Sequence, residues 1–439
     1  MRAAFTAVLL LAPAFFGAEP AKLPEPFRSI SDLAAAAPPE FAADALLRIV
    51  ESGRLTDQNA RRGLVEQAFQ LAASAKFSVP MQGLPGTTTD TASGSLSQAY
   101  ALKLDALSLQ SRAVRDMLPL EPSKARDLFG QMLKPTLAPL TCDDALVYDP
   151  SDFYQALSAV VNGSFTPKER AKEEHLNLLL EALGQATSPA ELVPLAGAIQ
   201  SAGVTAAQRQ ILWARFNGLL ESMQPDDRSF AASLPAVSAL SAPGIQGPLE
   251  KYRQKSHGCE ADAAPSSENH KAAKRPTTPA LERYWQSSNS QQLLQAGIKL
   301  RFAPSTQLLT DAERATPEWQ QQIADYLNLI ADWTPDQEGS DTIYYHEKCL
   351  VFEGLLDLAP PGSQRDKILA DYVDLIGNSG LYQKSPAEWY VEPHFLLGRF
   401  ETDAARYSKV IEAYQNSGNP VLTLEVALEK SWPAHQPRP

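Results

Sequence analysis

The sequence has 439 residues, of which 44% are hydrophobic and 21% charged, and its formal net charge is −12. This composition is typical of a folded protein and excludes a largely disordered chain, and the length favours two domains or one elongated array over a single ordinary core. The acidic balance argues against a nucleic-acid-binding protein, because phosphate binding requires a concentrated Lys and Arg surface.

The first 18 residues, MRAAFTAVLLLAPAFFGA, have the three parts of a secretory signal peptide. Arg2 supplies the positive charge, residues 3–11 form a short apolar run, and small residues supply the cleavage region. The apolar run is too short to span a bilayer, and no later stretch is long and apolar enough to do so. We therefore expect a mature chain without an integral membrane segment, exported as a soluble protein to the periplasm or outside the cell.

The three cysteines, Cys142, Cys259 and Cys349, are widely spaced. They allow at most one disulfide and leave one thiol over, and the spacing does not determine which two would pair. A disulfide framework is therefore excluded, and helix packing is expected to provide the stability.

Helices with clear boundaries are predicted from the beginning of the mature chain. Residues 39–51 and 57–75 carry apolar side chains at helical spacing and form a first helical hairpin. Residues 77–95 are rich in Pro, Gly, Thr and Ser and are predicted as a polar loop without a strand. A long helix over 96–118 and a shorter one over 122–133 follow.

Several helix starts repeat one capping device, with a hydroxyl at the N-cap, Pro at the first helical position and Glu three residues after the cap. The hydroxyl and the carboxylate satisfy backbone N–H groups that the first turn leaves without partners. The device occurs at Thr166-Pro167-Lys168-Glu169, Ser188-Pro189-Ala190-Glu191 and Ser385-Pro386-Ala387-Glu388, and without Pro at Thr205-Ala206-Ala207-Gln208. We interpret these Ser, Thr and Glu residues as structural and assign them no catalytic role.

The second half of the chain has a regular helix spacing. Helices are predicted over 279–286, 317–333, 341–358, 363–376, 386–397, 403–415 and 420–430. Starts two helices apart differ by 46 (317 to 363), 45 (341 to 386) and 40 (363 to 403), a period found in HEAT and armadillo repeats. The predicted organisation is a signal peptide (1–18), an N-terminal helical array (22–253), a polar linker (254–278), an aromatic-rich C-terminal helical array (279–431) and a disordered tail (432–439).

The fold predicted from these patterns is all-α, because no segment shows the sustained alternation of a strand. Within that class we expect an α-solenoid-like array of antiparallel helix pairs. It would be a right-handed superhelix of the HEAT, armadillo or tetratricopeptide kind, with no sizeable β-sheet.

Two groups of residues resemble metal-binding motifs, but each lacks residues that its motif requires. His346-Glu347-Lys348-Cys349-Leu350 is similar to the zinc-peptidase pattern HExxH, but Leu350 stands where the second His is required. We interpret Cys349 as a packed residue beside a surface His346. The acidic residues Asp143, Asp144, Asp149 and Asp152 lack the turn Gly and terminal Glu of a calcium loop, and a helix N-terminus is the favoured interpretation. We predict no metal and no cofactor.

Aromatic residues concentrate in the second half, with five of the six Trp and nine of the thirteen Tyr beyond residue 278. Aromatic rings on a curved helical surface stack on sugars or hold extended peptides, and the open alternative is that they fill wedges between helices. We predict a binding groove that contains Tyr345 or Trp389 together with Trp319 or Trp333.

The sequence contains no nucleophile elbow, P-loop, dinucleotide-binding fingerprint or EF-hand loop, so no catalytic residue is predicted. The first hypothesis is an exported, non-catalytic helical-repeat protein that binds or scaffolds a protein, peptide or glycan partner. The alternative is a cell-envelope hydrolase or lyase with a carboxylate-based site in a helical superhelix. That alternative requires a deep pocket with two convergent carboxylates.

Overall fold

The computed structural model describes most of the chain, namely residues 23–84, 92–226, 228–230, 245–255, 290–291, 293, 295, 310–333 and 341–431. Within these residues the chain is mostly helical and its strands form one two-stranded sheet, which confirms the all-α class. No helix in this part of the chain has both the length and the apolar character needed to cross a bilayer. The predicted signal peptide, the helix over 279–286, most of the linker and the tail fall outside the described residues.

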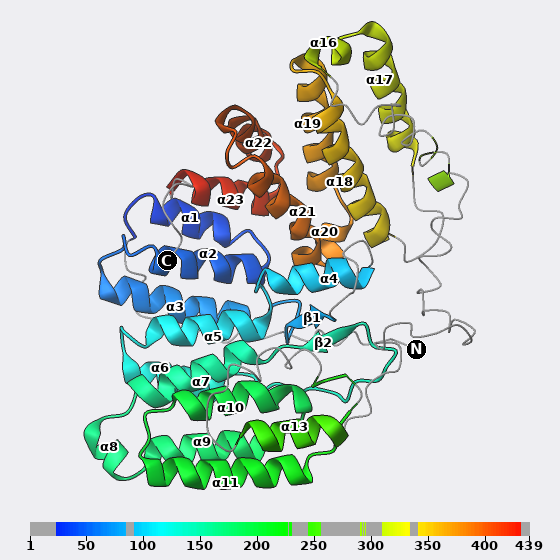
Figure 1. Ribbon diagram of the computed structural model, residues 1–439. Helices are drawn as coiled ribbons and strands as arrows, with labels where there is room; N and C mark the ends of the chain where they lie inside the picture. Colours follow the sequence, from blue (N-terminus) through cyan, green and yellow to red (C-terminus); the bar gives the residue numbers. More distant parts are fainter. Residues whose placement is uncertain are drawn as a thin grey trace, which may run out of the picture.

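The helices of the first half lie against one another in a long stack (Figure 1). They are α1 (Phe27–Ala34), α2 (Pro39–Glu51), α3 (Gln58–Ala72), α4 (Ala92–Ala101), α5 (Ala106–Met117), α6 (Pro122–Gln131), α7 (Ser151–Gly163), α8 (Pro167–Ala171), α9 (Glu174–Gln185), α10 (Leu192–Ser201), α11 (Ala206–Ser222) and α13 (Gln246–Lys255). A 3-10 turn, η1 (Pro189–Glu191), precedes α10.

The helices of the second half begin and end within two residues of the predicted positions. They are α16 (Asp311–Arg314), α17 (Pro317–Asp332), α18 (Asp341–Leu358), α19 (Ser363–Gly377), α20 (Leu381–Lys384), α21 (Pro386–Arg399), α22 (Ala404–Asn416) and α23 (Pro420–Ser431), of which the short α16 and α20 were not predicted. Helices α17, α18 and α19 rise steeply beside the stack (Figure 1).

Two local predictions in the first half are wrong. The helix predicted over 96–118 is broken into α4 and α5, because Lys103 has a left-handed backbone (φ 59°) and Asp105 caps a new helix by accepting from the backbone N–H of Ser108. The segment 77–95, predicted as a loop without helix or strand, contains a strand, β1 (Met81–Gly83), which pairs antiparallel with β2 (Leu146–Tyr148), and its last residues already belong to α4. The pairing partner lies far along the chain, and the strand is too short for a visible alternation.

The predicted capping boxes form at Thr166, Ser188 and Thr205, where both the hydroxyl and the side chain three residues later bond the backbone. The prediction fails at Ser385, which makes no side-chain cap bond. Its backbone N–H donates to the carbonyl of Leu381, 2.8 Å away, because α20 ends there. That N–H is therefore unavailable to Glu388.

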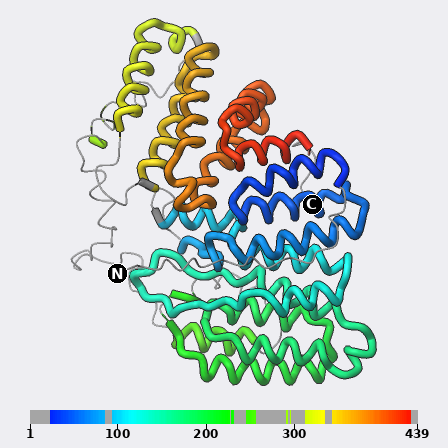
Figure 2. The backbone as a smooth tube through the Cα atoms, turned by 180° about the vertical axis from the view of Figure 1, so that it is seen from behind, coloured from blue at the N-terminus to red at the C-terminus, as the bar shows by residue number. Residues whose placement is uncertain are grey.

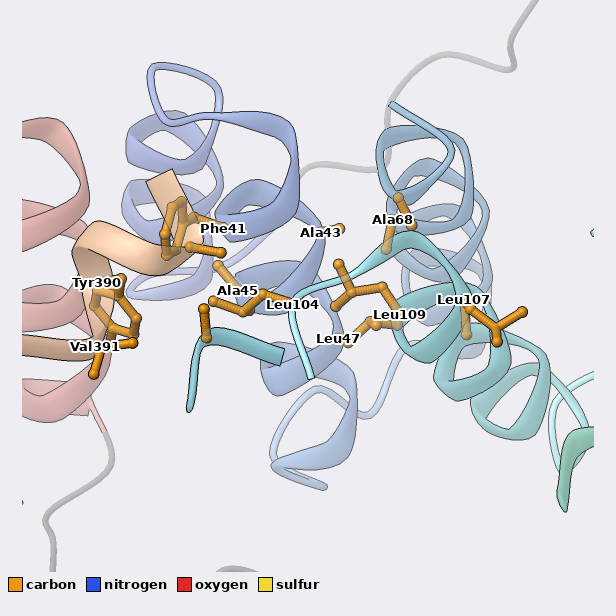
Figure 3. Close-up of a cluster of buried hydrophobic side chains, with 14 of the residues drawn as sticks. Phe41, Ala43, Ala45, Leu47, Ala68, Leu104, Leu107, Leu109, Tyr390 and Val391 are labelled. Carbon is orange, nitrogen blue, oxygen red and sulfur yellow. The ribbon is translucent and has the colours of Figure 1, made fainter. Parts of the chain in front are cut away.

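The two halves of the chain share one hydrophobic core. Helix α23 packs on α1 and α2, and α21 packs on α4, so the last helices return to the first ones, as Figure 2 also shows from behind. Figure 3 shows α2 at the centre of this contact, where the rings of Phe41 and Tyr390 lie 5.0 Å apart, edge to face. The guanidinium of Arg48 reaches Glu425 on α23 at 3.0 Å.

Contacts between neighbouring helices often join residues about forty positions apart. Examples are Arg126 with Glu169 and Ser158 with Ser201 in the first half, and Gln364 with Gln320, Lys409 with Asp366 and Arg399 with Glu353 in the second; these pairs are 43 to 46 positions apart. These helices are not neighbours in the chain: α18 lies between α17 and α19, and both α19 and the short α20 lie between α18 and α21.

Candidate binding site

The four aromatic residues predicted to line a groove are all buried between helices. The exposed fraction is 8% for Trp319, 2% for Trp333, 4% for Tyr345 and 0% for Trp389. The indole N–H of Trp319 donates to the carbonyl of Leu358, that of Trp333 to the hydroxyl of Ser290, and that of Trp389 to the carbonyl of Ile376. In this structure the four residues pack between helices, which corresponds to the alternative stated above, that the aromatic rings fill wedges between helices. Their role in a groove stays a prediction.

Two of these four aromatic residues, Tyr345 and Trp389, contact each other. The hydroxyl of Tyr345 on α18 donates to the backbone carbonyl of Trp389 on α21, 2.9 Å away. Trp319 and Trp333 lie near the two ends of α17, and the Trp333 ring packs on Tyr344 with centroids 5.0 Å apart.

His346 is buried, contrary to the predicted surface position. Its Nδ1 lies 2.5 Å from Oε1 of Glu392, which is the corresponding residue on the parallel helix α21. With the carboxylate as acceptor, Nδ1 is the donor in this contact. Within the described residues Nε2 has no hydrogen-bond partner. Helical periodicity placed His346 on a polar ridge, and a second helix covers that ridge.

Other ionisable groups surround this histidine. Burial raises the pKa of Glu388, one turn before Glu392, and the nearby His346 opposes that rise. Burial also raises the pKa of the Cys349 thiol, with Glu392 and Glu353 adding to it, and Cys349 is fully buried, as predicted. In the described part of the chain, no three His, Cys, Asp or Glu side chains are placed to hold a metal ion. The arrangement is a buried polar cluster between helices.

The acidic residues before α7 are used in local structure. Asp144 accepts from the backbone N–H of Thr141 at 2.7 Å, and Asp149 accepts from that of Ser151 at 3.2 Å. The ammonium of Lys103 lies between Asp149 (3.3 Å) and Asp152 (2.9 Å). These contacts hold the start of α7 against the α4–α5 turn.

A pocket of about 410 Å³ lies at the end of the first-half stack, where three segments meet. They are the segment after α6, the entry to η1 and α10, and the C-terminal end of α11. Its lining is Leu137, Pro139, Ala186, Thr187, Ser188, Pro189, Leu219, Ser222, Met223, Gln224, Pro225 and Asp226. The deeper positions, such as Leu137, Ala186 and Met223, are buried and apolar, and polar residues such as Thr187 and Gln224 are exposed.

The single carboxylate in this pocket is already satisfied. Asp226 Oδ1 accepts from the backbone N–H groups of Arg228 (3.1 Å) and Ser229 (2.6 Å), and Oδ2 accepts from that of Leu140 (3.1 Å). The pocket therefore presents an apolar floor and a polar rim without a pair of convergent carboxylates, which suits binding of an apolar group.

Sequence reasoning did not predict this pocket. Leu219 and Met223 belong to the apolar stripe of α11, which reads as ordinary core packing. The available signal is weak: the stripe runs to the last turn of the helix and is followed at once by Pro225. The segments that complete the pocket come from elsewhere in the chain.

Comparison of the chain with protein-family models, with curated proteins and with solved structures gives no match.

Proposed function

We propose that this protein is an exported, non-catalytic helical-repeat protein that binds an extended peptide or protein segment, and that the pocket beside Met223 receives an apolar side chain of this partner. The observation that carries the proposal is the pocket itself, with its buried apolar floor, its exposed polar rim and its position at the edge of a helix stack. Export rests on the signal-peptide pattern of residues 1–18.

The helix arrangement supports an array of repeated helix pairs. Contacts 43 to 46 positions apart recur in both halves of the chain, as expected when helix pairs stack at a regular interval along the sequence. Such arrays present extended surfaces on which a peptide contacts several helices at once.

The size and chemistry of the pocket favour a peptide side chain over a sugar. A volume of about 410 Å³ accommodates a bulky aliphatic or aromatic side chain, and the rim hydroxyl and amide groups can bond a peptide backbone. Glycan binding relies on aromatic rings open to the ligand, and the described pocket is lined by none. The hydrolase alternative requires two convergent carboxylates, whereas this pocket holds only the satisfied Asp226.

A selection from a random library of linear dodecapeptides tests the proposal with the full mature chain. We expect enriched peptides to share one large apolar residue, and Leu219→Trp, which fills the pocket, to weaken their binding at least tenfold. The matched control is Ile211→Trp on the same helix, where 49% of the residue is exposed away from the pocket. Equal binding by both variants, or enrichment without an apolar anchor, would show that the pocket is not the site.

A further inference from the structure

The pocket lies at the C-terminal ends of two neighbouring helices, α9 and α11, which run side by side at the end of the stack (Figure 1). Ala186, the C-cap of α9, and Ser222, the last residue of α11, both line the pocket. The last carbonyl groups of an α-helix have no partner within the helix and carry the negative end of the helix dipole. Two such ends beside one pocket favour a positively charged group at that place.

Neither of these two helix ends is capped by a side chain within the described part of the chain. The carbonyls of residues 183–185 in α9 and of residues 220–222 in α11 accept no hydrogen bond from another described residue. Neither helix has a basic residue in its last turn. The last turn of α11 contains instead the exposed Glu221, whose carboxylate adds to the negative end of the dipole.

Other helix ends of the same stack are capped by arginine. Arg170 donates to the carbonyl of Val161 in the last turn of α7 at 2.7 Å. Arg209 donates to the carbonyls of Gln200 (2.5 Å) and Ala202 (2.9 Å) at the end of α10. A guanidinium group suits this position because its planar set of N–H donors can bond two carbonyls at once. The ends of α9 and α11 lack such a group among the described residues.

The N-terminal end of η1 also meets the pocket, but its backbone donors are already used. The N–H groups of Thr187 and Ser188 both donate to Oε2 of Glu191 at 2.9 Å, and that of Ala190 donates to the Ser188 hydroxyl at 3.3 Å. The pocket lining contains one acidic residue, Asp226, and neither Lys nor Arg. The backbone groups that the described residues leave open beside the pocket are therefore the carbonyl acceptors of α9 and α11.

Basic side chains that are close to the lining in sequence do not fill this role. Lys134 pairs with Glu181 at 3.6 Å, and Arg228 donates to the carbonyl of Cys142 at 2.9 Å. Arg215 of α11 is not part of the lining. A cation at the end of α11 would therefore come from the bound partner.

We propose that the peptide segment that fills the pocket carries an arginine beside its apolar anchor, and that this arginine caps the C-terminal end of α11. The inference rests on the proposed function and specifies its partner, which is a basic, arginine-containing segment. The guanidinium would donate to the carbonyls of residues 220–222, as Arg209 does at the end of α10. The Glu221 carboxylate and the net charge of −12 attract the same cation.

Synthetic versions of a selected dodecapeptide that differ only beside the anchor test the arginine with the full mature chain. Citrulline keeps the shape of arginine and removes its charge, and we expect this change to weaken binding at least fivefold in isothermal titration calorimetry. Replacement by Ala should weaken binding at least tenfold. Between about 0.05 and about 0.5 M NaCl the arginine peptide should lose more affinity than the Ala peptide, because salt screens the attraction. Acetylation of the peptide N-terminus should leave the affinity unchanged.

Two matched variants of α11 and its C-terminal end test where the arginine binds. Gln224→Arg places a competing guanidinium on the exposed rim of the pocket, and Gln210→Arg places the same group at an exposed position near the start of the helix. We expect Gln224→Arg to weaken the arginine peptide at least fivefold and the Ala peptide less than twofold. Gln210→Arg should change neither affinity. Circular dichroism of both variants checks that they keep the helical fold.

The outcomes separate this inference from the proposed function. Peptides that lose binding with Leu219→Trp but tolerate both citrulline and Gln224→Arg would overturn the arginine inference and support the pocket as the site. Loss of binding on acetylation would also overturn it, because the peptide N-terminal amine would then supply the charge. Peptides that bind equally well to Leu219→Trp would reject the proposed function and the arginine inference together.

Discussion

The hydroxyl of Tyr345 donates a hydrogen bond to the backbone carbonyl of Trp389, 2.9 Å away, at the position where helix α21 cannot provide a donor of its own. The residue four positions later is Pro393, which has no N–H to give to that carbonyl. A side chain from α18 therefore completes the backbone bonding of α21, and both groups are buried. This contact allows a proline inside a buried helix and fixes α18 against α21.

Tyr345→Phe should lower the free energy of unfolding by about 1–3 kcal/mol, because it leaves a buried carbonyl without a donor. Pro393→Ala supplies an N–H to the same carbonyl, so in the Pro393→Ala background the loss from Tyr345→Phe should be smaller by at least about 0.5 kcal/mol. Urea unfolding of the four chains of this double-mutant cycle measures the difference. Strictly additive effects would mean that the hydroxyl and the missing N–H are not linked.

Helix α18 should be sensitive to truncation on its buried face and tolerant on its exposed one. Leu355 is 1% exposed and Leu350 is 43% exposed on the same helix. We expect Leu355→Ala to cost about 2–5 kcal/mol, and the matched change Leu350→Ala to cost less than about 1 kcal/mol. Thermal and urea unfolding of both variants measure these two costs. A larger cost for Leu350→Ala than for Leu355→Ala would show that the buried face of α18 lies elsewhere.

Asp116 should make the fold less stable as the pH rises. Burial, together with the negative charge of Glu51, raises the pKa of Asp116 to about 8, and Arg112 only partly opposes this rise. A folded pKa above the unfolded value means that the folded state binds the proton more tightly. The stabilisation is therefore fully present below the unfolded pKa of about 4 and is lost as the pH rises through the folded pKa.

Asp116→Asn replaces the ionisable carboxyl group with an amide that stays neutral at every pH. The variant should therefore gain stability relative to the wild type as the pH rises from 5 to 9. Urea unfolding of both chains at pH 5, 7 and 9 gives the comparison. A difference that stays constant over this range would show that Asp116 titrates alike in the folded and unfolded chains.

The ion pair between Arg48 and Glu425 should matter more than an exposed one, because it joins α2 to α23 across the contact between the two halves. Glu425→Ala leaves a half-buried guanidinium with more distant partners, and we expect a cost of about 1–3 kcal/mol. Lys367 and Asp371 form an exposed pair within α19, and Asp371→Ala should cost less than about 0.5 kcal/mol. Equal costs in urea unfolding would indicate that the α2–α23 pair adds nothing beyond a surface contact.

Local patterns in the sequence determined most of the helices. The helix over 341–358 was predicted with its observed ends, and the capping boxes at Thr166, Ser188 and Thr205 formed as expected. These features depend on residues within one or two helical turns of each other, so a single sequence contains the information. The break at Lys103 was missed because the apolar pattern continues across it; the left-handed backbone of Lys103 and the N-cap of Asp105 mark it in the structure.

Only the tertiary structure decided which side chains are buried and where a pocket forms. His346 lies on a polar ridge of its own helix, and it is buried because α21 brings Glu392 against it. The pocket is closed by the bond between Leu140 and Asp226, which are 86 positions apart. The spacing of apolar and polar residues along a helix shows only which face of that helix is apolar. The neighbour that covers each face is selected by the packing of the whole chain.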